Sequence, residues 1–268
     1  MSLLIKPNKP RTALVMAGGT GGHIFPGLAV AQELRSRGWN VHWLGAPGSM
    51  ESRIVPPQGF ALELIEFGGV RGKGLKTLVQ LPFRLAKAFS QARAVMKRVQ
   101  PDVVIGLGGY LTVPGGLMAA ASGVPVVLHE QNSVAGMANK VVAKVAKRVF
   151  TAFPKVFAKG EWVGNPLRQA FLEQAEPAQR FAGRSGPLKL LVVGGSLGAR
   201  ALNEIVPQAL ALMPADQRPV VLHQSGTAQI DALRANYQAA GVQAELTPFI
   251  DDTAKAFADA DLIVCRAG

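Results

Sequence analysis

The sequence predicts an α/β protein made of two similar units, each a parallel β-sheet with helices on both faces. Short apolar runs, typical of buried parallel strands, alternate with helical patterns along all 268 residues. The segment 14–22 (Leu-Val-Met-Ala-Gly-Gly-Thr-Gly-Gly) is also similar to the segment 190–198 (Leu-Leu-Val-Val-Gly-Gly-Ser-Leu-Gly). Because such units bind ligands where a strand ends, we expect a glycine-rich ligand loop after the first strand of each unit.

The individual elements follow from the same patterns. Strands are expected at 12–17, 40–45, 103–106, 124–129, 148–152, 189–194, 219–223, 245–248 and 261–265. Helices are expected at 26–37, 75–99, 113–122, 135–146, 200–212, 228–240 and 252–258. Turn residues at 162–166 interrupt the pattern, so we expect the first domain to span residues 1–163 and the second residues 164–268.

Composition narrows the class of protein. The single cysteine, Cys265, excludes an internal disulfide, and no apolar stretch is long enough to predict a transmembrane helix. The first 12 residues lack the apolar core of a signal peptide. The net charge of +12 comes from residues 67–160, which hold 14 basic and 2 acidic residues. This local excess predicts a polyanionic partner: a membrane surface, a phosphorylated substrate or a nucleic acid.

The first glycine-rich stretch, residues 16–27, has more functional groups than a turn requires. Thr20 and His23 stand among four glycines, Gly18, Gly19, Gly21 and Gly22. Glycine permits positive φ angles and close approach to a ligand, and a following helix offers free N–H groups to an anion. Neither the dinucleotide fingerprint nor the P-loop fits, because the third glycine and the lysine are missing. A purely structural turn is the alternative.

His23 is the one group in this stretch that could act as a general base. An imidazole near the start of a helix has a lowered proton affinity, which suits a base that works near neutral pH. A histidine on the surface, or one satisfied within the core, is an equally open interpretation of the sequence.

Three further stretches carry polar groups at the expected ends of strands. In the second loop, 194–200, backbone N–H groups and the Ser196 hydroxyl precede a helix, which suggests an anion cradle or again a structural turn. Tyr110 follows two glycines, and the run 129–132 (His-Glu-Gln-Asn) follows a buried strand. We expect a site there rather than a solvated loop. The four histidines lie apart, so we expect no metal site and no cofactor.

The segment 71–99 combines apolar and basic residues at helical spacing, with no acidic residue between Phe67 and Pro101. The expected membrane patch consists of Leu75, Leu78, Val79 and Phe83 with Lys76, Arg84 and Lys87. A basic amphipathic segment is typical of a membrane-surface contact, although the same apolar stripe could serve an ordinary helix against the core. Aromatic side chains for base stacking are not interleaved, so we expect no nucleic-acid partner.

These motifs occur together, in this order, in one known family. They are Gly-Gly-Thr-Gly-Gly-His at 18–23, Arg-Gly-Lys-Gly at 71–74, Gly-Gly-Tyr at 108–110, His-Glu-Gln-Asn at 129–132, Gly-Asn-Pro at 164–166 with Arg168, Gly-Gly-Ser at 194–196, and Phe-Ile-Asp-Asp at 249–252 with Cys265 and Arg266. From about Arg11 to its last residue the chain resembles the N-acetylglucosaminyltransferases of glycosyltransferase family 28.

The resemblance implies a GT-B fold, in which two Rossmann-like domains face a cleft. It implies inverting transfer of GlcNAc from UDP-GlcNAc to the C4 hydroxyl of MurNAc in undecaprenyl-linked lipid I, the step that makes lipid II for peptidoglycan. It implies a peripheral enzyme on the cytoplasmic face of the inner (plasma) membrane, with an anionic membrane surface and other cell-wall or division proteins as partners. No metal ion or cofactor is part of this family's reaction.

The resemblance also assigns residues to roles. His23 corresponds to the catalytic base. The donor or substrate contacts are Thr20, Gly21, Gly22, Asn132, Arg168, Ser196 and Ile250, the last through its backbone against the uracil. Tyr110 and Glu130 line the acceptor side.

Two departures from the family pattern affect these expectations. Leu197 replaces a glutamine that is usual in the family, which removes a side-chain contact and keeps the backbone cradle. The chain also stops at Gly268, before the family's ribose-binding glutamate, so we expect an incomplete second domain, weak UDP-GlcNAc binding and poor turnover. The alternatives to the transferase are a non-catalytic, membrane-docked sugar-nucleotide-binding module and a UDP-GlcNAc 2-epimerase.

Overall fold

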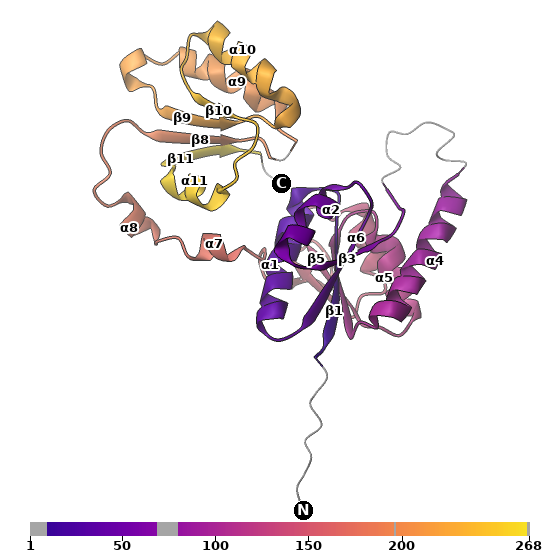
Figure 1. The fold of residues 1–268 in the computed structure, drawn as a ribbon. Helices are drawn as coiled ribbons and strands as arrows, with labels where there is room; N and C mark the ends of the chain where they lie inside the picture. Colours follow the sequence, from indigo (N-terminus) through magenta and orange to yellow (C-terminus); the bar gives the residue numbers. More distant parts are fainter. Residues whose placement is uncertain (1–9, 69–79, 196, 267–268) are drawn as a thin grey trace, which may run out of the picture. The chain divides into compact units, whose positions relative to one another are not determined.

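The computed structural model describes residues 10–68, 80–195 and 197–266, and it divides into two compact units (Figure 1). The first unit is Met1–Arg168 and the second is Gln169–Gly268, so the division falls five residues after the expected boundary at 163/164. We take each domain separately.

The first domain is built on a seven-stranded, entirely parallel sheet in the order β3-β2-β1-β4-β5-β6-β7. The strands are β1 (Thr12–Ala17), β2 (Asn40–Gly45), β3 (Ala61–Leu64), β4 (Val103–Gly108), β5 (Val126–Glu130), β6 (Arg148–Thr151) and β7 (Glu161–Trp162). All six residues of β1 are buried, as a central parallel strand requires.

Helices cover both faces of this sheet. They are α1 (Gly21–Ser36), α2 (Met50–Ile54), α4 (Leu81–Val99), α5 (Thr112–Ala121) and α6 (Met137–Val142), with a 3-10 turn, η1 (Pro56–Gln58). Alternate residues of β1 point to opposite faces: Leu14 and Met16 pack with residues of α4, α5 and α6, whereas Val15 and Ala17 pack with residues of α1. The predicted layers of helices are therefore confirmed.

The elements that the sequence patterns missed in this domain are the edge strands and a short helix. β7 has two residues, both exposed, and β3 has four residues at the opposite edge, none of them buried. Such short edge strands have no continuous apolar run, so periodicity does not reveal them. The expected helix 75–99 is described from Leu81, with Pro82 in its first turn, where a missing N–H group has no cost.

The second domain has a four-stranded parallel sheet in the order β10-β9-β8-β11. The strands are β8 (Lys189–Val193), β9 (Val220–Gln224), β10 (Glu245–Thr247) and β11 (Leu262–Cys265). The helices are α7 (Gln169–Leu172), α8 (Pro177–Phe181), α9 (Arg200–Ala211), α10 (Ile230–Ala240) and α11 (Thr253–Asp259), with the 3-10 turns η2 (Ala215–Gln217) and η3 (Thr227–Gln229). Leu233 and Tyr237 of α10 pack on Leu190 and Val192 of β8, and Figure 1 shows α11 on the opposite side of this sheet from α9 and α10.

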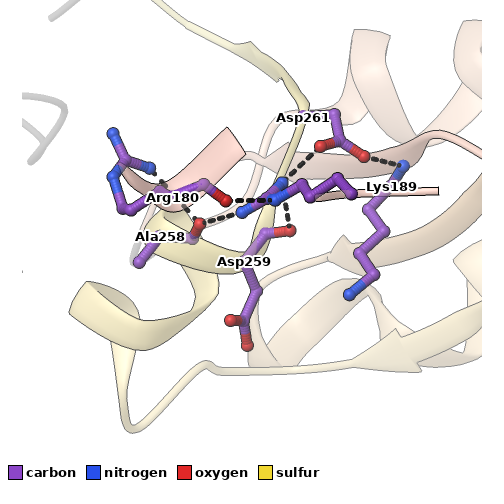
Figure 2. Close-up of polar contacts among 6 residues, drawn as sticks. Arg180, Lys189, Ala258, Asp259 and Asp261 are labelled. Atoms are coloured by element: carbon purple, nitrogen blue, oxygen red, sulfur yellow. Dashed lines mark hydrogen bonds and ion pairs between the residues drawn. The ribbon is translucent and has the colours of Figure 1, made fainter. Parts of the chain in front are cut away.

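A cluster of hydrogen bonds fastens the segment after α8 to the end of α11 (Figure 2). Arg184 donates to the backbone oxygens of Ala258 at 2.6 Å and Asp259 at 3.1 Å, and it forms an ion pair with Asp261. Asp261 also accepts from the backbone N of Lys189 at 2.8 Å, and these contacts hold the pKa of its carboxyl below the ordinary value. One arginine thus caps a helix C-terminus and joins it to the start of β8.

Replacing Arg184 by methionine is expected to lower the melting temperature of the second domain by about 4–8 °C, because the Asp259 carbonyl loses its donor, Asp261 loses its ion pair, and the Ala258 carbonyl keeps the longer contact from Arg180 at 3.3 Å. Thermal unfolding followed by circular dichroism measures this change. The matched control is Arg234→Met, since Arg234 forms an exposed ion pair with Asp231 three residues earlier. Equal melting temperatures for the two variants would contradict the assigned role of Arg184.

Candidate functional site

Three loops of the first domain meet where the strand order reverses. β2 lies on one side of β1 and β4 on the other, so the loops that follow β1 and β4 diverge to opposite faces and leave a crevice at the carboxyl end of the sheet. The backbone N of Gly18 donates to the Gly108 carbonyl at 3.1 Å, which joins the two loops directly. The run 129–132 consists of the last two residues of the next strand, β5, and the two residues after it, at the same edge.

Helix α1 begins inside the glycine-rich stretch, which corrects the expected start at residue 26. Thr20 is the N-cap residue, and its carbonyl accepts the first helical hydrogen bond from Ile24 at 3.1 Å. Gly21, Gly22 and His23 therefore form the first turn of the helix; the backbone N of His23 donates to the Thr20 carbonyl at 3.1 Å, whereas the N–H groups of the first two helical positions have no acceptor within a helix. These residues present the partial positive charge of a helix N-terminus at the crevice.

The four glycines of this stretch serve different purposes. Only Gly19 has a positive φ, +86°. A β-carbon on Gly18 would lie 2.8 Å from a carboxylate oxygen of Glu51, and one on Gly21 would lie 3.0 Å from the ring of Phe25. These two glycines allow close packing. A β-carbon on Gly22 would meet only ordinary van der Waals contact, with the Thr20 hydroxyl at 3.7 Å.

Glu51 is a functional candidate that sequence reasoning missed. Its side chain is buried in the first turn of α2, and its two oxygens accept from the backbone N of Gly19 at 3.1 Å and of Ala46 at 3.2 Å. The carboxylate therefore holds the loop that follows β1 in place through the backbone N of Gly19. The only signal in the sequence was an acidic residue two positions after Ser49, which caps α2, and that signal also fits an ordinary helix start.

His23 is half-buried and held by groups from two other loops. Its ring packs on Gly108, where any β-carbon would lie 2.7 Å from the imidazole. Its Nδ1 lies 3.0 Å from the Oε1 of Gln131, which is buried. The interpretation of His23 as a free surface histidine is thereby excluded, since the ring has a defined orientation at the crevice.

Glu130 lies deeper than its expected place on the acceptor side. The residue is 0% exposed, and each carboxylate oxygen accepts two hydrogen bonds, from Asn132 N and Nδ2 at 3.0 and 2.9 Å and from Gly136 N and Asn139 Nδ2 at 3.0 and 2.8 Å. Burial raises the pKa of this carboxyl, and the four donors outweigh burial and hold the pKa below 4.5. Glu130 therefore orients the side-chain amide of Asn132.

The low pKa of Glu130 gives a testable dependence of stability on pH. A carboxylate with a lowered folded pKa stabilises the fold above its unfolded pKa, near 4.5, and loses that effect as the pH falls through the folded pKa. Glu130→Gln should therefore lower the urea midpoint at pH 7, and its difference from the parent should shrink below about pH 4. Glu33→Gln, at an exposed ion pair with Arg37, should change little at either pH. A constant difference across this range would rule out the ionised form of Glu130 as the source of stability.

Two other predicted residues also lie at this edge. Tyr110 is exposed in the turn between β4 and α5, so its hydroxyl is available to a ligand. The guanidinium of Arg168 lies 4.6 Å from the centre of the Phe25 ring, which belongs to the second turn of α1. Through this cation–π contact, Arg168, the last residue of the first domain, packs on the helix that begins at Gly21.

The glycine-rich loop of the second domain occupies the equivalent position, after β8 and next to the reversal between β8 and β11. Its carbonyls are turned into the domain: that of Gly194 accepts from Arg266 at 2.8 Å, that of Gly195 from Gln224 at 3.0 Å and that of Leu197 from Gln229 at 3.1 Å. With carbonyls held in this way, N–H groups before α9 can face an anion, although that of Gly198 donates to the Gly195 carbonyl at 2.8 Å. Ser196 lies outside the described residues, and Ile250 lies half-buried between β10 and α11.

The described residues contain neither a helix that could span a membrane nor a cluster that could hold a metal ion. Within 10–68, 80–195 and 197–266, no helix combines the length and apolar character needed to cross a bilayer. Over the same ranges, no three His, Cys, Asp or Glu side chains gather in a way that could hold a metal ion.

Comparison with known proteins identifies both domains. Residues 13–151 match the glycosyltransferase family 28 N-terminal domain, and residues 189–268 match the family 28 C-terminal domain. A relative from Paracidovorax citrulli, named UDP-N-acetylglucosamine--N-acetylmuramyl-(pentapeptide) pyrophosphoryl-undecaprenol N-acetylglucosamine transferase, is 78% identical over 97% of this chain and 73% of its own length. A relative of the same name from Polaromonas sp. (strain JS666) is 73% identical over 96% of this chain and 68% of its own length.

Solved structures agree on the architecture. The crystal structure of Acinetobacter baumannii MurG is 41% identical, with a TM-score of 0.73 over 97% of this chain and 74% of that protein. UDP-GlcNAc 2-epimerase from Neisseria meningitidis is 12% identical, with a TM-score of 0.65 over 95% of this chain and 77% of that protein. At such low identity the second likeness shows the fold alone, which is the pair of Rossmann-like parallel-sheet domains of the GT-B class.

Proposed function

The chain belongs to glycosyltransferase family 28, and on that basis we propose that it transfers GlcNAc from UDP-GlcNAc to undecaprenyl-pyrophosphoryl-MurNAc-pentapeptide. The observation that carries the proposal is the match of both family models, in order, to two domains with a glycine-rich loop at the equivalent strand end. The relatives that share 78% and 73% of their aligned residues with this chain are named for this transfer.

The proposed chemistry is an inverting displacement with His23 as the base. The C4 hydroxyl of MurNAc gives its proton to Nε2 of His23 as its oxygen attacks the anomeric carbon of GlcNAc. The new C–O bond forms as the bond from that carbon to the diphosphate oxygen breaks, and UDP leaves with the electron pair. The support for this role is the orientation of the imidazole, which is held through Nδ1 and so leaves Nε2 for the hydroxyl.

The proposed donor contacts divide between the two domains. Thr20, Gly21 and Gly22 form the start of α1, and Asn132 is oriented by Glu130 at the same sheet edge. Arg168 is held against Phe25, next to this helix start, where a cation would help to neutralise a diphosphate. In the second domain, the loop 194–200 with Ser196 would hold phosphate, and the backbone of Ile250 would meet the uracil.

We propose that the first domain lies on the cytoplasmic face of the inner membrane. Its support is the surplus of basic residues in 67–160 and the exposed start of α4, where Phe83 is 79% exposed beside Arg84 and Lys87. The remaining residues of the proposed patch, Leu75, Lys76, Leu78 and Val79, lie outside the described residues. Apolar and basic groups together match the acyl boundary and anionic headgroups of a bilayer.

Phe83→Ser is expected to weaken binding to vesicles that contain anionic lipid by about 5–20-fold, because burial of one aromatic side chain contributes about 1.5–3 kcal/mol in full and less at an interface. Vesicle sedimentation with anionic and neutral lipids measures this effect. The control is Leu212→Ser, since Leu212 is 89% exposed but belongs to the second domain. Equal losses for both variants would remove the α4 surface from the proposal, and equal binding to both lipids would remove its electrostatic part.

Release of UDP from UDP-GlcNAc, with and without a lipid I analogue, tests the proposed reaction. Since this chain spans 73% of the Paracidovorax citrulli relative, the assay is run on this chain and on one extended by the C-terminal residues of that relative. Release that depends on the acceptor supports the transferase. Conversion of the sugar without acceptor would favour the epimerase alternative, and binding without release would favour a sugar-nucleotide-binding module.

A further inference from the structure

We propose that Gln131, itself oriented by His129, fixes the tautomer of His23 so that Nδ1 carries the proton and Nε2 is free to accept one. This inference deepens the proposed function, because it explains how His23 could act as the base. It makes Gln131 and His129 positioning residues, since neither is placed to touch the reacting atoms.

Three hydrogen bonds link the main chain to His23. Nε2 of His129 lies 2.9 Å from the Gly164 carbonyl oxygen, Nε2 of Gln131 lies 3.1 Å from Nδ1 of His129, and Oε1 of Gln131 lies 3.0 Å from Nδ1 of His23. The chain therefore runs from the loop after β7, through two side chains of the β5 edge, to the first turn of α1. It crosses the sheet edge at which the proposed ligands would bind.

The direction of each hydrogen bond follows from the Gly164 carbonyl. A carbonyl oxygen can only accept, so Nε2 of His129 must donate, and in the neutral ring Nδ1 of His129 must then accept. Its donor is the amide NH₂ group of Gln131, and the Oε1 of that amide therefore faces His23. Because an amide oxygen can only accept, Nδ1 of His23 carries a proton.

A second contact fixes the same amide orientation independently. Nε2 of Gln131 also donates to the backbone oxygen of His129, at 3.2 Å, and that oxygen cannot donate in return. Even without the argument from Gly164, the NH₂ group must therefore face His129 and the oxygen must face His23. The NH₂ group of Gln131 therefore faces two acceptors of His129, and its oxygen faces Nδ1 of His23. This is the one amide orientation that agrees with all three contacts.

Burial keeps this arrangement from exchanging with water. His129 is 5% exposed and Gln131 is 7% exposed, so an unpaired donor or acceptor in either would be destabilising. Burial also lowers the pKa of His129 against the raising effects of the Gly164 hydrogen bond and the Glu130 charge, which favours the neutral ring that the argument requires.

The neutral amide has a consequence that a carboxylate would not have. A carboxylate beside Nδ1 would also fix the tautomer, but it would add a negative charge that favours the protonated imidazole. Glutamine orients the ring without that charge. This difference separates the proposed role from simple packing, because Gln131→Glu conserves size and the acceptor that faces His23, while it removes the donor that faces His129.

The experiment reads the tautomer directly. In the full chain labelled with ¹⁵N-histidine, long-range ¹H–¹⁵N correlation above the histidine pKa should show His23 with a protonated Nδ1 and an unprotonated Nε2 in the parent and in Gln131→Glu. In Gln131→Met the two tautomers should mix. The control is Gln58→Met at an exposed glutamine that contacts Gln32 and Arg35 in the same domain, which should leave the His23 signals unchanged.

The kinetic readout accompanies the spectra. Gln131→Met should lower kcat by about 10-fold or more, with little change in the KM for UDP-GlcNAc; a wrong tautomer can cost about 10⁴-fold in serine proteases. Gln131→Glu should move the acidic limb of the pH–rate profile upward by about one unit or more. If Gln131→Met fails to fold, the tautomer of His23 in the parent and in Gln131→Glu still tests the inference.

The outcomes separate this inference from the proposed function. A proton on Nε2 of His23 in the parent, or an unchanged tautomer in Gln131→Met, would overturn the inference whatever the activity. The expected tautomers together with full activity of a His23 variant would instead reject His23 as the base and leave the orienting role of Gln131 intact.

Discussion

His23→Ala should lower kcat for GlcNAc transfer by about 10²–10⁴-fold, the range that a positioned general base contributes. The acceptor hydroxyl is weakly acidic, so its oxygen attacks efficiently only if a base takes the proton as the bond forms. The structure places the imidazole in the first turn of α1, on Gly108 and against Gln131, with one nitrogen occupied and one available. No comparable group lies beside it in the run 18–22.

Rapid-quench measurement of UDP release at saturating UDP-GlcNAc and lipid I analogue checks this prediction, with calorimetric titration of UDP-GlcNAc alongside. Donor affinity should change less than about threefold, because the loss lies in the transition state rather than in ground-state binding. His42→Ala is the matched control, since His42 pairs with Glu63 on the surface strands β2 and β3. A kcat within about threefold of the parent would rule out His23 as the base.

The sequence predicted the parts of this molecule that depend on long apolar runs. The nine predicted strands all exist, because each is a buried or half-buried run of a parallel sheet. Prediction failed at β3 and β7, where two to four residues at the sheet edge carry no repeating pattern. It also misplaced the start of α1, since consecutive glycines are typical of a loop and only the chain's close packing on Glu51 and Phe25 explains them as a helix start.

The candidate site likewise contains residues that the sequence could predict and residues whose role it could not. Motif residues such as His23 and Asn132 could be selected, because polar groups after a buried strand indicate a ligand site. Glu130 and the run 129–132 were selected as well, but the positioning roles of Glu51, Glu130 and Gln131 could not be predicted, because each role depends on hydrogen bonds that only the folded chain forms. Glu130 was expected at the acceptor, and its sequence neighbours gave no sign that four donors would surround its carboxylate.

In the loop of the second domain, the main chain leaves no room for a side chain at Gly198. Gly198 is buried with a φ of +76°, and a β-carbon on it would lie 1.8 Å from the backbone oxygen of Ser225 and 3.0 Å from Nε2 of Gln229. The Ser225 backbone cannot yield easily, because its own N donates to Thr247 at 3.0 Å in the adjacent strand. Alanine at this position must therefore displace the loop that would hold the donor diphosphate.

Gly198→Ala is accordingly expected to destabilise the second domain by about 2–5 kcal/mol, as the sum of the left-handed backbone and the overpacked contact, and to weaken UDP-GlcNAc binding by at least about 10-fold. Urea unfolding and calorimetric titration measure the two effects. Gly241→Ala is the matched control: Gly241 also has a positive φ, +62°, but nothing lies within 4 Å of its β-carbon position, so only the backbone cost of about 1–2 kcal/mol remains. If the two variants lost equal stability, steric contact with Ser225 could not be what requires glycine at 198. If Gly198→Ala lost stability and still bound UDP-GlcNAc as the parent does, the loop 194–200 could not be the diphosphate cradle.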